Sequence, residues 1–254
     1  MAPTPRHGKD SKLYVGKRNF TPFVQDGTVS ASLDVPEVTT WGDSDKEYLP
    51  GGVGDVTGSF DGLWSQSATA ADDIVRYFDA ALGGSTNHIV TWGPEGDTAG
   101  RYCYLYEAVQ TGWDVDAPTS DVVKVALDLQ GSKGLDMGVW LRALSTNSSS
   151  TGMGTAVACE GSTTVGGTTG GGVAHLHATS INSTGNLTVR VQHSSNGSTW
   201  ATLLTFSAAS TATVQRSTVS GTIKERLRAG VSSFSTDGAA TFAVAFARRG
   251  KLRG

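Results

Sequence analysis

A strand and a helix in the first half of the chain decide the fold. The strand reads Asp55-Val-Thr-Gly-Ser-Phe-Asp-Gly-Leu-Trp64, and the helix follows a polar turn as Ala70-Ala-Asp-Asp-Ile-Val-Arg-Tyr-Phe-Asp-Ala-Ala-Leu82, closed by Gly83-Gly84. Apolar residues on one helical stripe indicate a helix buried along that stripe. We therefore expect one helix packed on an otherwise all-β protein. Its core residues are Ile74, Tyr77, Phe78 and Leu82.

Both ends of this helix carry capping residues. Ser67 or Thr69 can cap the start, and Asp72 and Asp73 suit the positive end of the helix dipole. Gly83 can adopt the left-handed conformation that commonly ends a helix. The acidic pair is therefore explained by structure rather than by acid–base chemistry.

Charge is distributed unevenly along the 254 residues. The formal net charge is -3, but residues 1–134 carry a net of -9 and residues 135–254 a net of +6. This asymmetry implies two regions with different surfaces. Two cysteines are too few for a disulfide framework, and the sequence has neither a membrane-length apolar run nor a hydrophobic signal core. We expect a soluble protein, assembled in the cytoplasm, without a membrane partner.

The order of motifs predicts an N-terminal β domain and a second β domain. Residues 1–11 read as a flexible N-terminal arm, and residues 12–134 as a β-sandwich or barrel bearing the helix. Within it, residues 41–54 are acidic, aromatic and glycine-rich, which predicts a long projecting loop. Glycines at 131–134 mark the expected domain junction.

The second domain, residues 135–254, has strand patterns and no helix pattern. It contains a Gly/Ser/Thr-rich loop, residues 145–172, whose composition predicts flexibility. Asn196-Gly197 predicts a tight hairpin with a type I′ turn. These features favour a jelly-roll or immunoglobulin-like β-sandwich.

Motifs for catalysis and for cofactor binding are nearly absent, so we expect no enzyme and assign no catalytic, cofactor-binding or metal site. His175 and His177 would lie on one face of a strand, which suits a metal pair, but no third ligand is evident. Two polar residues on an exposed strand face are the preferred interpretation. A cluster of Arg and Lys at positions 224, 226, 228 and 248–253 favours a solvated face or a contact with an acidic protein surface over nucleic-acid recognition.

The order of these segments resembles the major tail tube proteins of long-tailed, siphovirus-type bacteriophages. The resemblance covers roughly residues 12–131 and depends on the long acidic loop, the segment 55–64, the helix and the closing strand that ends at 122–129. The second domain looks like the additional C-terminal β-sandwich of some such proteins. The fold class so implied is mainly β, a tail-tube-type sandwich or barrel with one α-helix followed by a jelly-roll or Ig-like sandwich.

The resemblance implies a structural virion protein of the tail. Such proteins form rings, commonly hexameric, that stack into a tube, which is the conduit for DNA delivery into the host. The implied partners are copies of the chain itself, a tape-measure protein and a tail terminator protein, while DNA passes without specific binding. Because a lumen of like charge repels the DNA backbone, we expect carboxylates from residues 12–131 to face the channel.

The same resemblance gives the loop at 41–54 a role in contacts between rings. Its candidate contact residues are Trp41, Asp43, Asp45, Tyr48 and Leu49. Rings of six subunits, or of three with both halves acting as tube domains, are both open, and the lack of a second helix favours six. A capsid decoration or spike protein, and a carbohydrate-binding module in which Trp200 contacts sugars, are alternative functions.

Overall fold

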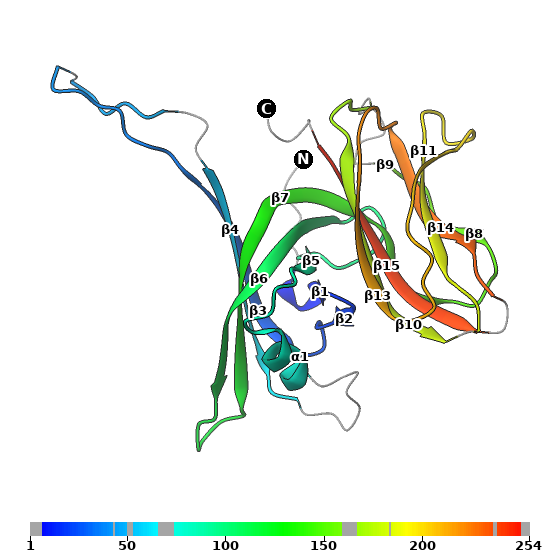
Figure 1. Cartoon of the computed structure of the whole chain (residues 1–254), viewed down its shortest axis with the longest axis horizontal. Helices are drawn as coiled ribbons and strands as arrows, with labels where there is room; N and C mark the ends of the chain where they lie inside the picture. The colour runs from blue at the N-terminus through cyan, green and yellow to red at the C-terminus, as the bar shows by residue number, and fades with distance from the viewer. Residues whose placement is uncertain are drawn as a thin grey trace. The chain divides into compact units, whose positions relative to one another are not determined.

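Antiparallel strands make up most of the chain, and one short α-helix accompanies them (Figure 1). The structure is a computed structural model that describes residues 7–42, 44–49, 53–65, 74–158, 167–182, 184–235 and 238–249. The mainly β fold class with one helix, predicted from the sequence, is confirmed. The expected flexible N-terminal segment, residues 1–11, is described only from His7 onward. There a 3-10 helix, η1 (Gly8–Asp10), precedes the first strand.

The chain divides into two compact units. Unit 1 comprises Met1–Pro22, Ile89–Leu105 and Asp136–Gly254, and unit 2 comprises Phe23–His88 and Tyr106–Leu135. This differs from the linear division at 134/135, because two early segments group with the C-terminal part. Two long strands, β6 (Tyr102–Asp116) and β7 (Lys124–Asn147), contribute to both units.

Strand β7 passes straight through the glycines at which we expected a domain junction. Residues 131–134 lie within its 24 residues, so they form no linker. Glycine at 131 is instead required by a close approach, since a Cβ there would lie 2.7 Å from the Cβ of Val56. Glycine-rich sequence here reflects backbone proximity rather than chain flexibility.

Unit 1 contains two sheets. The first has the strand order β13-β10-β15-β7-β6-β5-β1-β2, and the second has the order β12-β11-β14-β8, with β9 also paired to β14. The strands not yet given are β1 (Lys12–Val15), β2 (Arg18–Asn19), β5 (His88–Gly93), β8 (Gly152–Met153), β9 (Val157–Ala158), β10 (Gly172–Asn182), β11 (Thr188–Ser194), β12 (Ala201–Thr205), β13 (Thr213–Val219), β14 (Arg226–Ser233) and β15 (Ala239–Arg248).

The two sheets of unit 1 share one hydrophobic core. Buried side chains of β7, β10 and β15 pack with those of β11 and β14, among them Leu176, Val191, Leu227 and Phe246. On β15, Phe242, Val244 and Phe246 belong to this core. The alternate residues Ala243, Ala245 and Ala247 belong to a second buried cluster that includes Tyr14. Burial on both faces explains why this strand reads as continuously apolar rather than alternating.

Two expectations for the second domain need correction. The described parts of the 145–172 segment include the end of β7 and strands β8 and β9, both of which hydrogen-bond to β14, while 159–166 lie outside the described residues. Strands β11 and β12 do form the expected hairpin, but residues 195–200 connect them instead of a two-residue turn. Asn196 directs this longer loop, because its Oδ1 accepts hydrogen bonds from the backbone of Ser198 and Thr199.

Unit 2 is built around the strand predicted at 55–64. Strand β4 (Val53–Leu63) pairs with β3 (Val24–Asp34) on one side and with β7 on the other, with Phe60 opposite Leu127. Helix α1 (Ile74–Ala81) supplies Phe78, which is buried and lies 5.2 Å from the ring of Trp113. Gly83 has φ +76°, the left-handed conformation expected at the helix end.

The expected helix core is found only in part. Phe78 is 3% exposed, Tyr77 is half-buried, and the side chain of Ile74 lies outside the described residues, as do the cap candidates 67 and 69. Leu82 is 48% exposed, contrary to the expectation that it covers the core. It follows the last helical residue, where the chain is already turning into Gly83, so its side chain leaves the buried stripe.

Candidate assembly surface

Exposed hydrophobic side chains concentrate in unit 2. Among the described residues, ten of the eleven large hydrophobic side chains that are exposed belong to this unit, and only Tyr102 belongs to unit 1. By contrast, unit 2 contributes eight of the 39 buried hydrophobic residues. Clustered exposed apolar side chains mark surfaces that another protein covers.

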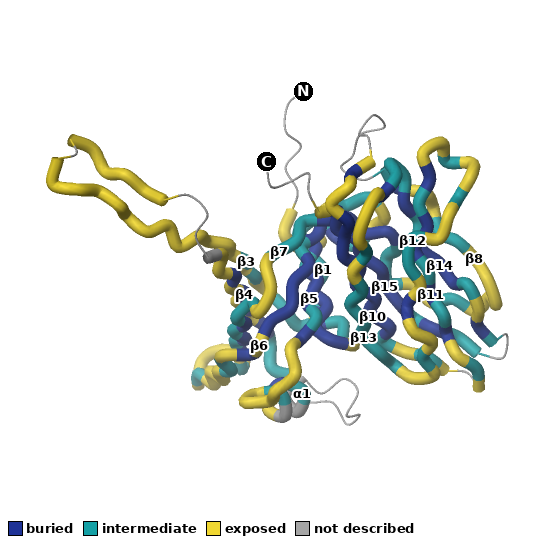
Figure 2. Tube along the Cα trace, turned by 45° about the horizontal axis from the view of Figure 1, so that its top comes forward, coloured by how far each residue is buried: buried dark blue, intermediate teal, exposed yellow. Residues whose placement is uncertain are grey.

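The largest group of these side chains lies on a ribbon that continues β3 and β4, which we call the arm (residues 35–49). Figure 1 shows it as the extended blue segment beyond β4, and Figure 2 shows it as exposed along its described length. Its two strands are joined by backbone hydrogen bonds from Val38 N to Glu47 O and from Leu49 N to Pro36 O, both 2.9 Å. The described residues of the expected loop therefore belong to a two-stranded ribbon that begins before it. Exposed apolar side chains on this ribbon are Val35, Val38, Trp41, Tyr48 and Leu49.

The candidate contact residues at the arm's end are accessible to a partner. Trp41 is fully exposed, with a relative accessible surface of 107%, and Tyr48 and Leu49 are each more than half exposed. Asp45 is exposed, and Asp43 lies outside the described residues. Three apolar side chains on one narrow ribbon give the arm the character of an anchor for a hydrophobic pocket.

Polar contacts join the two sides of the arm. Lys46 Nζ lies 3.0 Å from Glu37 Oε2, and the backbone N–H of Glu47 donates to Thr39 Oγ1 at 3.0 Å. Because both charged side chains are well exposed, the ion pair contributes little to stability. Its cross-strand position instead favours one register of the ribbon.

Strand β3 offers a second contact surface. It hydrogen-bonds to β4 along one edge, and within the described residues no strand pairs with its other edge. Most of its eleven residues are exposed. A long open edge of this kind can receive a strand from another chain.

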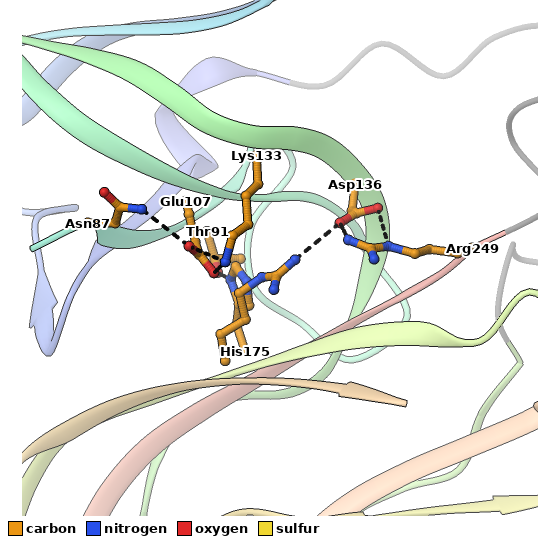
Figure 3. Close-up of polar contacts among 8 residues, drawn as sticks. Asn87, Thr91, Glu107, Lys133, Asp136, His175 and Arg249 are labelled. Atoms are coloured by element: carbon orange, nitrogen blue, oxygen red, sulfur yellow. Dashed lines mark hydrogen bonds and ion pairs between the residues drawn. The ribbon is translucent and has the colours of Figure 1, made fainter. Parts of the chain in front are cut away.

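A cluster of polar side chains joins residue 87, strand β6 and strand β7 within unit 2. Figure 3 shows Asn87 and Lys133 converging on Glu107, with Lys133 Nζ 2.9 Å from Glu107 Oε2. Asn87 Nδ2 lies 3.5 Å from the same oxygen and donates to Ser132 Oγ at 2.8 Å. The nearly buried Glu107 carboxylate is thereby neutralised and hydrogen-bonded, which indicates a structural role.

His175 and His177 are fully buried, which corrects the expectation of an exposed strand face. Thr91 Oγ1 lies 2.9 Å from His175 Nδ1 and 2.8 Å from His177 Nε2, and His177 Nδ1 lies 2.7 Å from the Gly16 carbonyl (Figure 3 shows the Thr91 and His175 side chains). Alanines oppose both histidines across β15, at 245 and 243. The small alanine side chains leave room for the two imidazoles. The alternation of alanines with larger apolar residues on β15 was the sequence pattern that could have predicted the burial of the two histidines.

The hydrogen bonds fix the tautomers of both histidines. A carbonyl only accepts, so His177 Nδ1 carries the hydrogen and its Nε2 accepts from the Thr91 hydroxyl. Thr91 has no second hydrogen, so it accepts from His175 Nδ1, and His175 Nε2 is left without a hydrogen-bond partner. Burial lowers the pKa of His177 to about 4. Burial is also the main cause that lowers the pKa of His175, and its proximity to His177 and to the charge of Arg216 lowers that pKa further. Both rings are thus neutral at pH 7 and act as structural links between strands β5 and β10.

One carboxylate in unit 1 binds the end of β15. Arg249 donates from Nε to Asp136 Oδ1 at 3.1 Å and from a terminal nitrogen to Oδ2 at 2.8 Å, and Arg216 lies 4.0 Å from Oδ2 (Figure 3). The paired geometry raises the pKa of Arg249, mainly through the hydrogen bond with Asp136. Within the described ranges, no group of three or more His, Cys, Asp or Glu side chains is arranged to hold a metal ion. The same residues include no helix long and apolar enough to cross a membrane.

The comparisons with known proteins find structural rather than sequence similarity. No family model and no curated protein matches the chain. The tail of an empty gene transfer agent particle with C6 symmetry is similar with a TM-score of 0.40 and 14% identity over 52% of this chain and 97% of that chain. The phage SPP1 tail tube is similar with a TM-score of 0.41 and 11% identity over 52% and 78% of the two chains. The SPP1 Dit protein, described as a hub of the adsorption apparatus, covers 93% of this chain and 98% of its own, with a TM-score of 0.40 and 10% identity.

Proposed function

We propose that this protein is a structural virion protein that polymerises as stacked, hexameric rings to form a phage tail tube. The observation that carries the proposal is the exposed apolar arm of unit 2, an ordered ribbon that buries none of its large side chains in its own chain. Burying one such side chain contributes about 1.5–3 kcal/mol. Seating Trp41, Tyr48 and Leu49 against a neighbour would therefore supply a large part of one contact between rings.

The open edge of β3 supports contacts of a second kind, between subunits of one ring. Edge-to-edge pairing joins unlike surfaces of two copies, and such head-to-tail contacts close into a ring at a suitable rotation. One helix per chain favours six copies over three. The arm then links one ring to the next, so both features of unit 2 have a role in the same assembly.

The acidic excess of residues 1–134 fits a channel for DNA. We place carboxylates from residues 12–131 on the lumen, where they repel the DNA backbone and leave it free to slide. In this role the protein belongs to the virion tail, and its partners are its own copies with tape-measure and terminator proteins. No catalytic step is assigned to it.

Negative-stain electron microscopy of the purified full chain tests the proposal. We expect tubes of stacked rings with a central channel at high protein concentration. Monomers, or compact oligomers without filaments, would contradict it, and the latter would favour a capsid decoration or spike protein. Single closed rings that never stack would also contradict the tube and would instead fit a hub, the role named for the SPP1 Dit protein.

A further inference from the structure

A row of arginines crosses the outer face of the second sheet of unit 1. Arg226 and Arg228 lie two residues apart on β14, opposite Ser194 and Gln192 of β11, and Arg190 lies one rung further, opposite Gly230. Their neighbours Val191, Leu227 and Ala229 point into the core, so the three arginines share the face away from it. Successive rungs on one face are about 7 Å apart, so the guanidinium groups form a line.

These three charges are not balanced by acidic side chains. Within the described parts of the chain, no Asp or Glu forms an ion pair with any of the three arginines, whereas Arg101, Arg216 and Arg249 each have one. Burial and the nearby charge of Arg190 lower the pKa of Arg228, and Arg190 Nε is enclosed without a hydrogen-bond partner. Like charges held side by side repel one another, and an anion bound across them would relieve that repulsion.

The centre of the row is held rigidly. Arg228 stacks on the ring of Trp200, 4.1 Å from its centroid, and its Nε donates to Gln192 Oε1 at 2.9 Å. Trp200 is itself fixed by a bond from Nε1 to the Gly197 carbonyl at 3.0 Å, within a loop stabilised by Asn196. Because Nε is engaged, the terminal nitrogens of Arg228 are presented in one orientation. A preorganised guanidinium loses little entropy when it binds a carboxylate or phosphate.

The rest of the face carries neutral polar groups. Thr202 lies opposite Gln192 and Thr205 lies opposite Arg190, and both threonines are exposed. Hydroxyl and amide groups beside guanidinium groups suit a ligand that carries hydroxyls as well as negative charge. A nucleic acid fits less well, because one face of the single aromatic ring is already covered by Arg228 and no series of stacking positions is present among the described side chains of this face.

We propose that this face, formed by Arg190, Arg226, Arg228, Trp200 and Gln192, binds an acidic polysaccharide whose repeating units carry carboxylate or phosphate groups. The arginines pair with successive anionic groups, while Gln192 holds Arg228 in place and the exposed Thr202 and Thr205 hydrogen-bond to sugar hydroxyls. The face is formed by residues of unit 1, whereas the arm and β3 are residues of unit 2, so the variants that test binding leave the proposed assembly residues unchanged. The site gives the second sheet a role in surface recognition.

Binding of full-length protein to immobilised polygalacturonate, a phosphomannan and neutral dextran tests the proposal. We expect salt-sensitive binding to one or both acidic polymers, which distinguishes carboxylate from phosphate, and none to dextran. The double variant Arg190→Gln with Arg228→Gln should weaken binding by at least about tenfold. Arg228→Lys keeps the charge but loses the paired geometry, so it should also weaken binding.

Arg101→Gln is the matched control, since it removes a half-exposed arginine of the same unit outside this face. Equal loss in this control, binding to dextran as strong as to the acidic polymers, or no binding to either acidic polymer would overturn the proposal. So would binding confined to single-stranded DNA or to a second copy of the chain. Microscopy of the same variants separates the two proposals, because tubes should form normally even where polysaccharide binding is lost.

Discussion

The two units differ in how many of their large hydrophobic side chains are buried. Unit 1 closes two sheets over a shared core and exposes one large hydrophobic side chain among its described residues, whereas unit 2 buries few and exposes ten. A sheet covered on one face by a single short helix cannot enclose all its apolar residues. The difference teaches that unit 1 encloses its apolar side chains by its own packing, while unit 2 leaves exposed the apolar side chains that the proposed assembly would cover.

Removing the arm's end should have the largest effect. We expect deletion of residues 43–50 to abolish tubes while leaving a folded subunit, because the backbone hydrogen bonds of Glu47 and Leu49 join them only to the facing strand of the arm. Microscopy reports assembly and circular dichroism reports folding. Replacing Trp41, Tyr48 and Leu49 together with Ser should give the same result without shortening the chain.

Leu82→Ser is the control for the arm, since it removes an exposed hydrophobic side chain of unit 2 that lies outside it. Normal tubes from the deletion variant would show that the arm is not the contact between rings. If the deletion variant fails to fold, the arm is part of the folded structure of unit 2. The contrast between the two units would then be lost.

A core substitution in unit 1 should be the most damaging to stability. Phe246→Ala empties a fully buried site between the two sheets and is expected to lower the free energy of unfolding by about 3–5 kcal/mol. Leu33→Ala on β3 removes a side chain that is 64% exposed and should change it by less than about 0.5 kcal/mol. Denaturant unfolding of both variants measures the difference, and similar losses would show that Leu33 is packed.

The histidine pair makes the stability of unit 1 dependent on pH. The pKa of His177 is about 4 in the folded protein and near 6.5 when exposed, so only the unfolded chain gains a proton between these values. The stabilisation is complete above pH 6.5 and is lost as the pH falls toward 4, by on the order of 3 kcal/mol. Denaturant unfolding at pH 7.5, 6 and 5 measures the loss.

Two variants identify the source of that pH dependence. His177→Gln removes one of the two buried rings and should make the decline shallower, with the remainder due to His175, although it lowers stability at pH 7.5. His7→Gln, which replaces an exposed histidine, should leave the decline unchanged. A decline that persists fully in His177→Gln would assign it to other groups.

The smallest expected effect concerns the ion pair on the arm. Lys46→Ala removes an exposed contact with Glu37 and should change the free energy of unfolding by no more than about 1 kcal/mol. Thermal unfolding of the isolated subunit measures this. A shift of several degrees in this variant would show that the arm contributes to the folded state of unit 2 and is not merely presented by it.

Sequence patterns were reliable where one face of an element is buried and the other is not. Periodicity located β4 and helix α1, and glycine at 83 marked the helix end. They were unreliable where burial is two-sided or where backbones approach closely. The histidines of β10 looked solvent-exposed because alternation does not reveal a second layer, and the glycines at 131–134 looked like a linker because sequence does not show what Val56 touches.

Composition predicted a projecting loop at 41–54 with Trp41, Tyr48 and Leu49 as contact residues, but only the structure shows that the ribbon begins earlier and that Val35 and Val38 are exposed on it. The row of arginines is a further case, since Arg190 lies far in sequence from Arg226 and Arg228, and only the register of β11 with β14 brings them onto adjacent rungs.

By itself, the sequence determined that the chain is mainly β, that one helix follows the strand at 55–64, and that the two halves carry opposite charge. These properties depend on local periodicity and composition, which neighbouring residues encode directly. Tertiary structure alone decided which segments form each unit, which histidines are buried, and which side chains share a face. Those properties depend on pairings between residues far apart in the sequence, such as Gly16 and His177, which are 161 positions apart, and such pairings leave no local trace in the sequence.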